Sequence, residues 1–316
     1  MQEEVGILFH QLLLFGTFII VGYLARACRL ITDEMVTGLA QIVAKVLLPL
    51  MILTTLGSNT GGLVALSHML PFLAGTLIMY GVLFGLGLVT AKLMRLPQPT
   101  RNVHTISMGF TNSGFMGLPL LLSIFPQEAV IAFVPFSFLE TILLWGFCQP
   151  LTQPVHTGKK EPFRIKRLLT TVNLSLVLGL ILMISGLNPS GAIWEGLTAL
   201  GGTCKYMALL YVGGIIGVRG IPALLKRKQA FVMIPLKLIL APLLVFFIVG
   251  SLGLLSPTYL MILTIYTSLP CMVMVAILVE NNGSDGEYAI SAVLGTTIFS
   301  LGTMPLVMWF LSTYFL

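Results

Sequence analysis

Charged residues are scarce in this sequence: Asp, Glu, Lys and Arg make up 9% of its 316 residues, whereas hydrophobic residues make up 57%. Soluble domains contain about 25% charged residues, so this scarcity excludes an ordinary soluble protein. Polar stretches are short, none exceeding about a dozen residues, which leaves no room for a soluble domain of at least ~50 residues. The composition predicts an all-α polytopic membrane protein.

Paired cysteines and catalytic motifs are missing as well. The four cysteines are not spaced as CxxC, which argues against a disulfide framework and a zinc site. No phosphate-binding loop, nucleotide motif, metal triad or nucleophile–base signature occurs, so we expect neither an enzyme nor a cofactor. The net charge of +6 comes mainly from short basic loops, which membrane topology requires, and does not indicate a nucleic-acid partner.

Long apolar runs are what the chain does contain. A transmembrane helix needs about 20 mainly apolar residues. Ten segments meet this requirement: 5–27, 35–56, 63–91, 104–125, 128–151, 168–187, 195–218, 230–251, 257–279 and 288–314. Five lie in residues 1–152 and five in 168–316, joined by a basic linker at 153–167. The start lacks the basic region of a cleaved signal peptide, so we expect the first segment to remain in the protein.

The basic residues indicate how these segments are oriented in the lipid bilayer. Fourteen of the 17 Lys and Arg residues lie in alternate connections, those after segments one, three, five and seven, and the opposite connections contain none. Short cytoplasmic loops are enriched in Lys and Arg. We therefore expect these four loops inside and both termini outside.

Weak similarities between the two halves suggest an internal repeat. Lys45 and Lys205 are 160 residues apart, and Glu128 and Glu287 are 159 apart. Because each half would contain five helices, an odd number, the second repeat would be inverted in the membrane. Chance matches between apolar segments are the alternative.

The fourth apolar segment is interrupted. Residues 109–119 read Gly-Phe-Thr-Asn-Ser-Gly-Phe-Met-Gly-Leu-Pro, and both glycine and proline weaken a helix interior. Such a break is tolerated in a membrane only inside protein or beside a water-filled cavity, and interrupted helices point to the binding sites of transporters. Close helix packing through small residues is the alternative interpretation.

The interruption carries a family resemblance. Residues 112–119 resemble the N-[ST]-G-F-[ML]-G-[LI]-P segment of the auxin efflux carrier family. Residues 22–26 are similar to the family's G-Y-L-x-R start, 48–50 to the end of its second helix and 237–242 to its eighth helix. The short loops resemble those of prokaryotic members, not the long-loop plant PIN auxin carriers, which implies a bacterial cytoplasmic membrane.

This resemblance implies two inverted five-helix repeats whose fourth and ninth helices are broken and cross, as in bile-acid symporters and NhaA-type folds. Helices 1, 2, 6 and 7 would form a scaffold or a homodimer interface, and helices 3–5 and 8–10 would carry the crossing. Prokaryotic members are associated with small carboxylates such as malonate and malate, and plant members with auxin. Thr111 stands where plant carriers have a crossover proline.

We expect the substrate to bind where the two breaks meet. Asn112 and Ser113 offer hydrogen-bond donors to a carboxylate beside a half-helix N-terminus, whose free N–H groups also favour anions. A simple helix cap is the alternative role for Asn112. Gly114 loosens the fourth helix, and Pro270 and Cys271 mark the break of the ninth.

Three lysines lie within the predicted helices, Lys45, Lys205 and Lys237, and Glu140 is the one acidic residue deep in a helix. A lysine in mid-membrane is costly and usually faces a cavity or a partner. One carboxylate cannot neutralise three ammonium groups, which favours an anionic substrate or leaves some lysines neutral. Lys45 and Lys205 are the stronger candidates for substrate binding, because Lys237 lies nearer the cytoplasmic end. Glu140 is either a proton carrier or the partner of a lysine.

The sequence therefore predicts a secondary transporter of small organic anions that works by alternating access about helices four and nine. A sodium-coupled symporter of the bile-acid type and a non-transporting carboxylate receptor remain alternatives, so the coupling ion is a proton or sodium. Glu280 and Asp285 are expected to be solvated. The histidines lie near helix ends or in loops and are expected at the membrane interface: His10, His68, His104 and His156.

Overall fold

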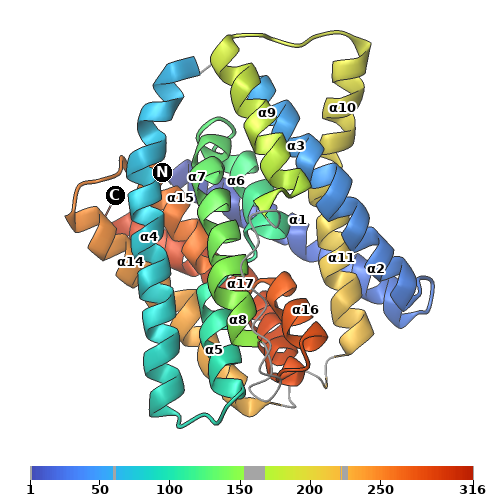
Figure 1. Ribbon diagram of the computed structural model, residues 1–316, viewed down its shortest axis with the longest axis vertical. Coiled ribbons are helices and arrows are strands. Elements are labelled where there is room, and N and C mark those ends of the chain that lie inside the picture. Colours follow the sequence, from blue (N-terminus) through green and yellow to red (C-terminus); the bar gives the residue numbers. More distant parts are fainter. Residues whose placement is uncertain (1, 60–61, 153–167, 221, 223–226, 316) are drawn as a thin grey trace.

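The computed structural model describes residues 2–59, 62–152, 168–220, 222 and 227–315, and within them the chain is helical with one isolated β-bridge (Figure 1). The linker predicted at 153–167 lies outside this part. Within the described residues, seven helical stretches are long and apolar enough to cross a membrane: Phe9–Ala27, Asp33–Gly57, Leu66–Leu93, Glu128–Thr152, Ala192–Arg219, Lys228–Ser251 and Gly286–Tyr314. The prediction of an all-helical multi-pass protein is confirmed.

The first half begins with α1 (Gln2–Ala27), after which α2 (Asp33–Ile42) runs through a π-helical turn (Val43–Leu47) into α3 (Leu48–Gly57), and α4 covers Gly62–Leu93. The fourth predicted span divides into α5 (Thr100–Gly109), a π-turn (Ser113–Gly117) and α6 (Leu118–Ile124). The fifth comprises α7 (Glu128–Leu143), a π-turn (Leu144–Cys148) and α8 (Gln149–Thr152).

The second half begins with α9 (Thr171–Ser185), followed by α10 (Ala192–Gly202) and α11 (Cys204–Arg219). A 3-10 turn (Lys228–Val232), α13 (Met233–Pro235), a π-turn (Leu236–Leu240) and α14 (Ala241–Ser251) form the eighth predicted span. The ninth divides into α15 (Pro257–Ser268) and α16 (Val273–Asn281), and the tenth is α17 (Gly286–Tyr314). Ten helical spans are compatible with this order, and the inverted repeat stays a prediction.

The four π-turns share one sequence feature, which is a proline two residues after each turn. These prolines are the second residues of the next helices: Pro49, Pro119, Pro150 and Pro242. A proline ring clashes with the carbonyl group four residues earlier. In each π-turn a backbone N–H instead donates to the carbonyl group five residues earlier, as Leu48 N–H donates to the Val43 carbonyl oxygen. The wider turn leaves space for the proline ring. Such turns often occur at functional sites.

The helices pack as two groups. In the first group α1 packs against α11, and α3 packs against α9 and α10; in the second, α4 packs against α5, α7 and α14, and α14 packs against α15. Figure 1 places α2, α3, α10 and α11 on one side of the molecule and α4, α14 and α15 on the other. The first group corresponds to the predicted spans 1, 2, 6 and 7. The second corresponds to the predicted spans 3–5 and 8–10.

Two glycines allow the close approach of α1 and α11. A Cβ atom on Gly22 would lie 2.2 Å from the carbonyl oxygen of Leu210, and one on Gly213 would lie 2.0 Å from that of Ile19. These are backbone atoms of the facing helix, so a side chain at either position would force the helices apart. Small residues permit such approach between membrane helices.

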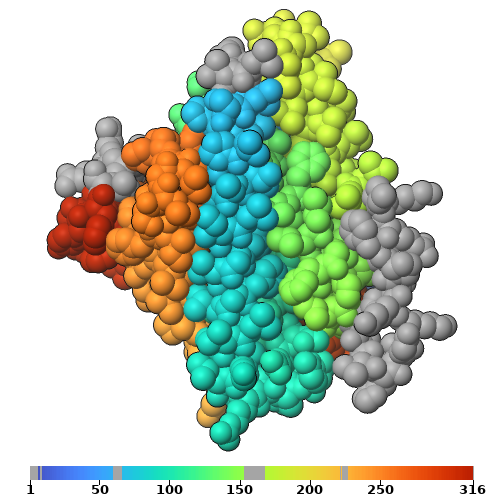
Figure 2. Space-filling model, turned by 60° about the vertical axis from the view of Figure 1, so that its left-hand side comes forward, coloured from blue at the N-terminus to red at the C-terminus, as the bar shows by residue number. Residues whose placement is uncertain are grey.

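The outer surface suits contact with lipid. Figure 2 shows α4 running along one face between α14 and α7. The apolar side chains of Leu70, Leu77, Leu88 and Val89 on α4 are exposed. Exposed apolar side chains along such a helix agree with a membrane-spanning fold.

Candidate functional site

The breaks of the fourth and ninth predicted spans meet inside the protein. The chain is extended at Phe110, after α5, and at Leu269, after α15. The Asn112 N–H donates to the Pro270 carbonyl oxygen at 2.9 Å, and the Met272 N–H donates to the Phe110 carbonyl oxygen at 3.2 Å. Peptide groups released by the two breaks thereby satisfy each other, as a non-aqueous interior demands. The predicted proximity of Asn112 and Pro270 is confirmed.

Two further contacts hold this crossing in place. Thr111 and Cys271 form the isolated antiparallel bridge between the breaks, and the Cys271 N–H donates to Oγ1 of Thr296 on α17 at 3.0 Å. Nζ of Lys237 donates to the carbonyl oxygens of Met108 and Phe110, at 2.6 and 3.0 Å. The crossing is therefore fixed by the backbone, a hydroxyl group and an ammonium group.

A cavity of about 220 Å³ opens beside the break of the fourth span. Asn112, Ser113 and Gly114 line it from the break, and Glu140 lines it from α7. Its remaining walls are mainly apolar and come from α3, α7, the start of α9 and the chain after the second break: Leu48, Phe133, Leu144, Val172, Met272 and Met274. An apolar pocket with a few convergent polar groups is the usual form of a small-molecule site.

Asn112 lines this cavity and has a buried hydrogen-bond donor without a partner in the described part of the chain. The residue is 3% exposed, and its Nδ2 has no partner among the residues that the structure describes. The backbone carbonyl oxygen of Asn112 accepts from the N–H groups of Met116 and Gly117, at 3.2 and 3.0 Å, and so begins the helix Ser113–Ile124. A buried amide group without a partner is costly. The amide and the helix N-terminus together favour an anion.

Glu140 is held by hydroxyl groups. Ser113 donates to its Oε2 at 2.6 Å and Tyr80 to its Oε1 at 3.3 Å. The side chain lines the cavity and the residue is only 6% exposed. Among the described residues no ion pair joins Glu140 to a lysine, so the geometry does not favour the alternative in which it partners one.

The two lysines predicted to bind substrate lie away from the cavity. Lys45, in the first π-turn, is exposed. Lys205 is half-buried, with its Nζ 4.8 Å from the centre of the Tyr206 ring. Neither lines the cavity, so a contact between either lysine and the substrate stays a prediction. Gly114 lies in the π-turn, two residues after the break, whereas Pro270 and Cys271 belong to the crossing itself.

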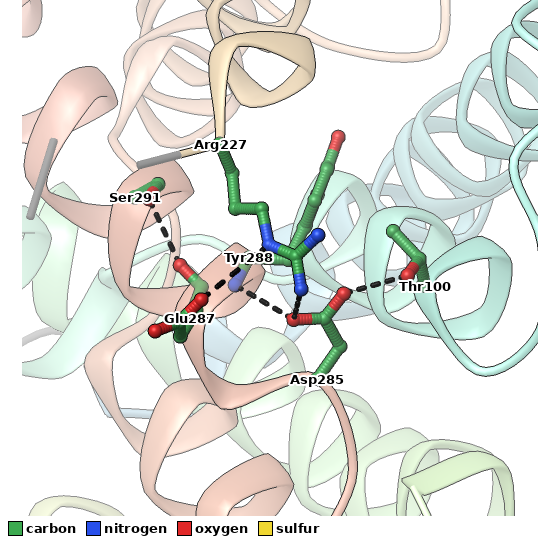
Figure 3. Close-up of polar contacts among 6 residues, drawn as sticks. All are labelled: Thr100, Arg227, Asp285, Glu287, Tyr288 and Ser291. Carbon is green, nitrogen blue, oxygen red and sulfur yellow. Dashed lines mark hydrogen bonds and ion pairs between the residues drawn. The ribbon is translucent and has the colours of Figure 1, made fainter. Parts of the chain in front are cut away.

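A second polar cluster lies at the end of the molecule where α17 begins (Figure 3). Asp285 accepts from the Thr100 hydroxyl at 2.6 Å, from the Tyr288 N–H at 3.1 Å and from Arg227 at 3.2 Å. Its side chain is only 7% exposed, so the expectation that Asp285 is solvated was wrong. The start of α5 and the start of α17 are thereby joined through one carboxylate.

His104 lies between this cluster and the crossing, and it is fully buried. Its Nδ1 lies 2.6 Å from the Tyr288 hydroxyl and its Nε2 lies 2.7 Å from Oγ1 of Thr90. The expectation that His104 sits at the membrane interface was therefore wrong. The Thr90 hydroxyl donates to the Leu86 carbonyl oxygen at 2.6 Å, so it accepts from Nε2–H, and Nδ1 accepts from Tyr288.

Sequence reasoning missed Tyr80 and undervalued Lys237. Tyr80 is buried on α4 and contacts Glu140 from 60 positions away in the chain. Lys237 is fully buried at the crossing. The available signal in both cases was a polar group in an apolar span, but the spacing did not show which face each would occupy.

Comparison with known proteins points to membrane transport. The family model described as membrane transport protein matches residues 7–167 and 160–308. A protein of Methanothermobacter thermautotrophicus described as an uncharacterized transporter is 23% identical over 297 residues, which cover 91% of this chain and 93% of that protein. The match spans nearly the whole chain, both breaks included. The chain belongs to the membrane transport protein family, the family of the auxin efflux carriers.

Proposed function

We propose that this protein is a secondary transporter of small organic anions and that it binds a carboxylate beside the break of the fourth span. The observation that carries this proposal concerns Asn112. This residue is buried and lines the cavity, and its side-chain Nδ2 has no partner among the described residues. The N-terminus of the helix Ser113–Ile124 adds N–H groups and a favourable dipole at the same place.

The size of the cavity favours a small substrate. Its volume of about 220 Å³ is below the ~300–1,000 Å³ typical of pockets for drug-sized ligands. Compact carboxylates of the malonate and malate class suit this volume, and the apolar walls accommodate their short carbon chain. An auxin-like weak acid, with its aromatic ring, is the larger alternative.

Glu140 is our candidate for proton coupling. Glu140 lines the same cavity as Asn112, and its carboxyl group accepts a hydrogen bond from the Ser113 hydroxyl. A bound anion and an ionised Glu140 would repel each other in a medium of low polarity. Uptake of one proton by Glu140 together with the substrate removes this repulsion and links the two movements.

Transport would proceed by alternating access. The group of helices that contains both breaks would move against the group formed by α1, α3, α9, α10 and α11, as carriers with inverted repeats do. The extensive packing inside each group supports its movement as a unit. We place both termini outside, because fourteen basic residues occupy alternate connections. The resemblance to short-loop prokaryotic members favours a bacterial cytoplasmic membrane.

Binding and counterflow together test this function. Asn112→Ala removes a donor from a desolvated site, and a lost hydrogen bond to a charged group costs about 1.5–3 kcal/mol, or roughly 10- to 150-fold in affinity. Calorimetry with a panel of carboxylates measures this loss on folded, monodisperse protein. Asn188→Ala, the same change at an exposed position, is the matched control.

The outcomes separate the proposed function from its rivals. If Asn112→Ala binds within about twofold of the parent protein, the substrate binds elsewhere, because the expected loss is at least about tenfold. Labelled substrate should exchange across proteoliposome membranes in counterflow. A receptor binds the carboxylate but gives no counterflow, and a sodium-coupled symporter requires sodium for uptake.

A further inference from the structure

Lys237 lies where a broken-helix carrier could hold a coupling cation. The residue is fully buried in the π-turn Leu236–Leu240. Its Nζ donates to the carbonyl oxygens of Met108 and Phe110, at 2.6 and 3.0 Å, where α5 ends at Gly109. The last carbonyl groups of a helix lack helical partners and carry partial negative charge. Half-helix C-terminal ends and unwound carbonyl groups coordinate Na⁺ or H⁺ in such carriers.

The surroundings of these two carbonyl groups also resemble a cation site. Ser107 and Thr111 flank them in the chain, and within the described part both hydroxyl groups are buried without a partner. Carbonyl and hydroxyl oxygens are the ligands that hard cations prefer. The Phe110 carbonyl oxygen also accepts from Met272 N–H across the crossing. A positive charge at this point therefore stabilises the junction of the two broken helices.

Glu140 gives this charge a second role. Lys237 and Glu140 are both buried, and no direct ion pair joins them in the part of the chain that the structure describes. A cation at the end of α5 balances an ionised Glu140 from a distance, because charges are weakly screened in the protein interior.

We propose that the Lys237 ammonium group is a tethered cation that takes the place of sodium at the crossing, so that the cycle needs no sodium ion there. The claim that the cycle needs no sodium rests on the proposed transport function, whereas the role of Lys237 in stabilising the crossing does not. The proposal makes sodium and the lysine interchangeable: removing the side chain should create a requirement for the ion.

Purified wild type and Lys237→Ala are compared in sodium chloride and in choline chloride of equal ionic strength. Thermal unfolding is measured without substrate, and counterflow is measured in proteoliposomes. Wild type should behave alike in both salts. Lys237→Ala should lose about tenfold or more of its counterflow rate in choline, because two hydrogen bonds from a charged donor are gone, and sodium should restore most of that rate and the unfolding temperature.

Two other variants show whether the restored behaviour comes from this site. Lys237→Met keeps apolar bulk in the position of the side chain, so sodium should not rescue it. Lys92→Ala removes an exposed lysine that has no part in the proposed site and should show no difference between the salts.

Three results would overturn the proposal: a sodium requirement in wild type, equal behaviour of Lys237→Ala in both salts, or a Lys237→Ala protein that does not fold in either. Calorimetry of carboxylate binding to wild type tests the proposed function separately. A protein that binds no carboxylate but whose Lys237→Ala variant is stabilised by sodium would retain the tethered cation and lose only its link to transport.

Discussion

The Ser113 hydroxyl donates a 2.6 Å hydrogen bond to Oε2 of Glu140, which joins the break of the fourth span to α7 inside the cavity. A change in the protonation of Glu140 therefore acts directly on the residue next to Asn112. Proton uptake by Glu140 therefore changes the geometry of the binding site without requiring a helix to move.

Glu140→Gln should abolish transport driven by a pH gradient and leave substrate exchange intact. Glutamine keeps the size of the side chain and can still accept from one of the two hydroxyl groups through its oxygen, but it cannot take up a proton. Uptake driven by an imposed pH gradient and counterflow without a gradient are measured on the same proteoliposomes. Glu195→Gln, the same change at an exposed residue, is the control. Unchanged pH-driven uptake in Glu140→Gln would remove this residue from the coupling mechanism.

Labelling of single cysteines should show that the connection before α10 faces outward and the one before α5 faces inward. Ser190 and Gln98 are exposed residues of these two connections. In a background with Cys28 replaced by Ser, an impermeant maleimide should label Ser190→Cys in intact cells and Gln98→Cys only after permeabilisation. The reason is the concentration of basic residues on the Gln98 side. The reverse pattern would show that the termini face inward.

Gly213→Ala should destabilise the protein because the new Cβ would lie 2.0 Å from a backbone oxygen of α1. Overpacking of this kind costs about 1–3 kcal/mol. Thermal unfolding in detergent should show a clearly lower midpoint. Gly81→Ala is the matched control, since a Cβ there meets nothing within 4 Å and alanine favours a helix. Equal midpoints for the two variants would mean that α1 and α11 are free to separate.

Asp285→Asn should weaken the cluster at the start of α17 while keeping its N-cap. Asparagine caps a helix as well as aspartate does, so the variant loses mainly the charge that faces Arg227 and Thr100. Because the Arg227 side chain is 41% exposed, solvent screening limits the expected loss to about 1 kcal/mol. Asp33→Asn removes the carboxylate of the exposed pair with Arg26 and should change the unfolding midpoint less. A larger effect at Asp33 would contradict the assignment.

The break of the fourth span was predictable because its glycines, proline and small polar residues stand in an otherwise apolar run. The same local signal led to Asn112 and Ser113, whereas Glu140 stood out as the one acidic residue deep in a span. The structure brings all three to one cavity. The resemblance of residues 112–119 to a family motif added the ninth span as the second partner of the crossing.

The lysines show where sequence reasoning stops. Depth along a span can be counted from the sequence, but the direction that a side chain faces depends on which helices pack around it. The depth argument favoured Lys45 over Lys237, yet Lys45 is exposed and Lys237 is fully buried. His104 was placed outside the core for the same reason, because its burial depends on Tyr288, 184 positions away.

The π-turns have a consequence for insertions and deletions. Three of them contribute to the cavity, through Ala44, Ser113 and Leu144, and the fourth carries Lys237. A helix advances about 100° per residue, so the one additional residue in each turn rotates every later side chain by that angle relative to a regular helix. Deleting one residue from Ser113–Gly117 would turn the whole of α6 to a different face, whereas replacing one would not. In these four helices, the number of residues before each proline matters as much as their identity.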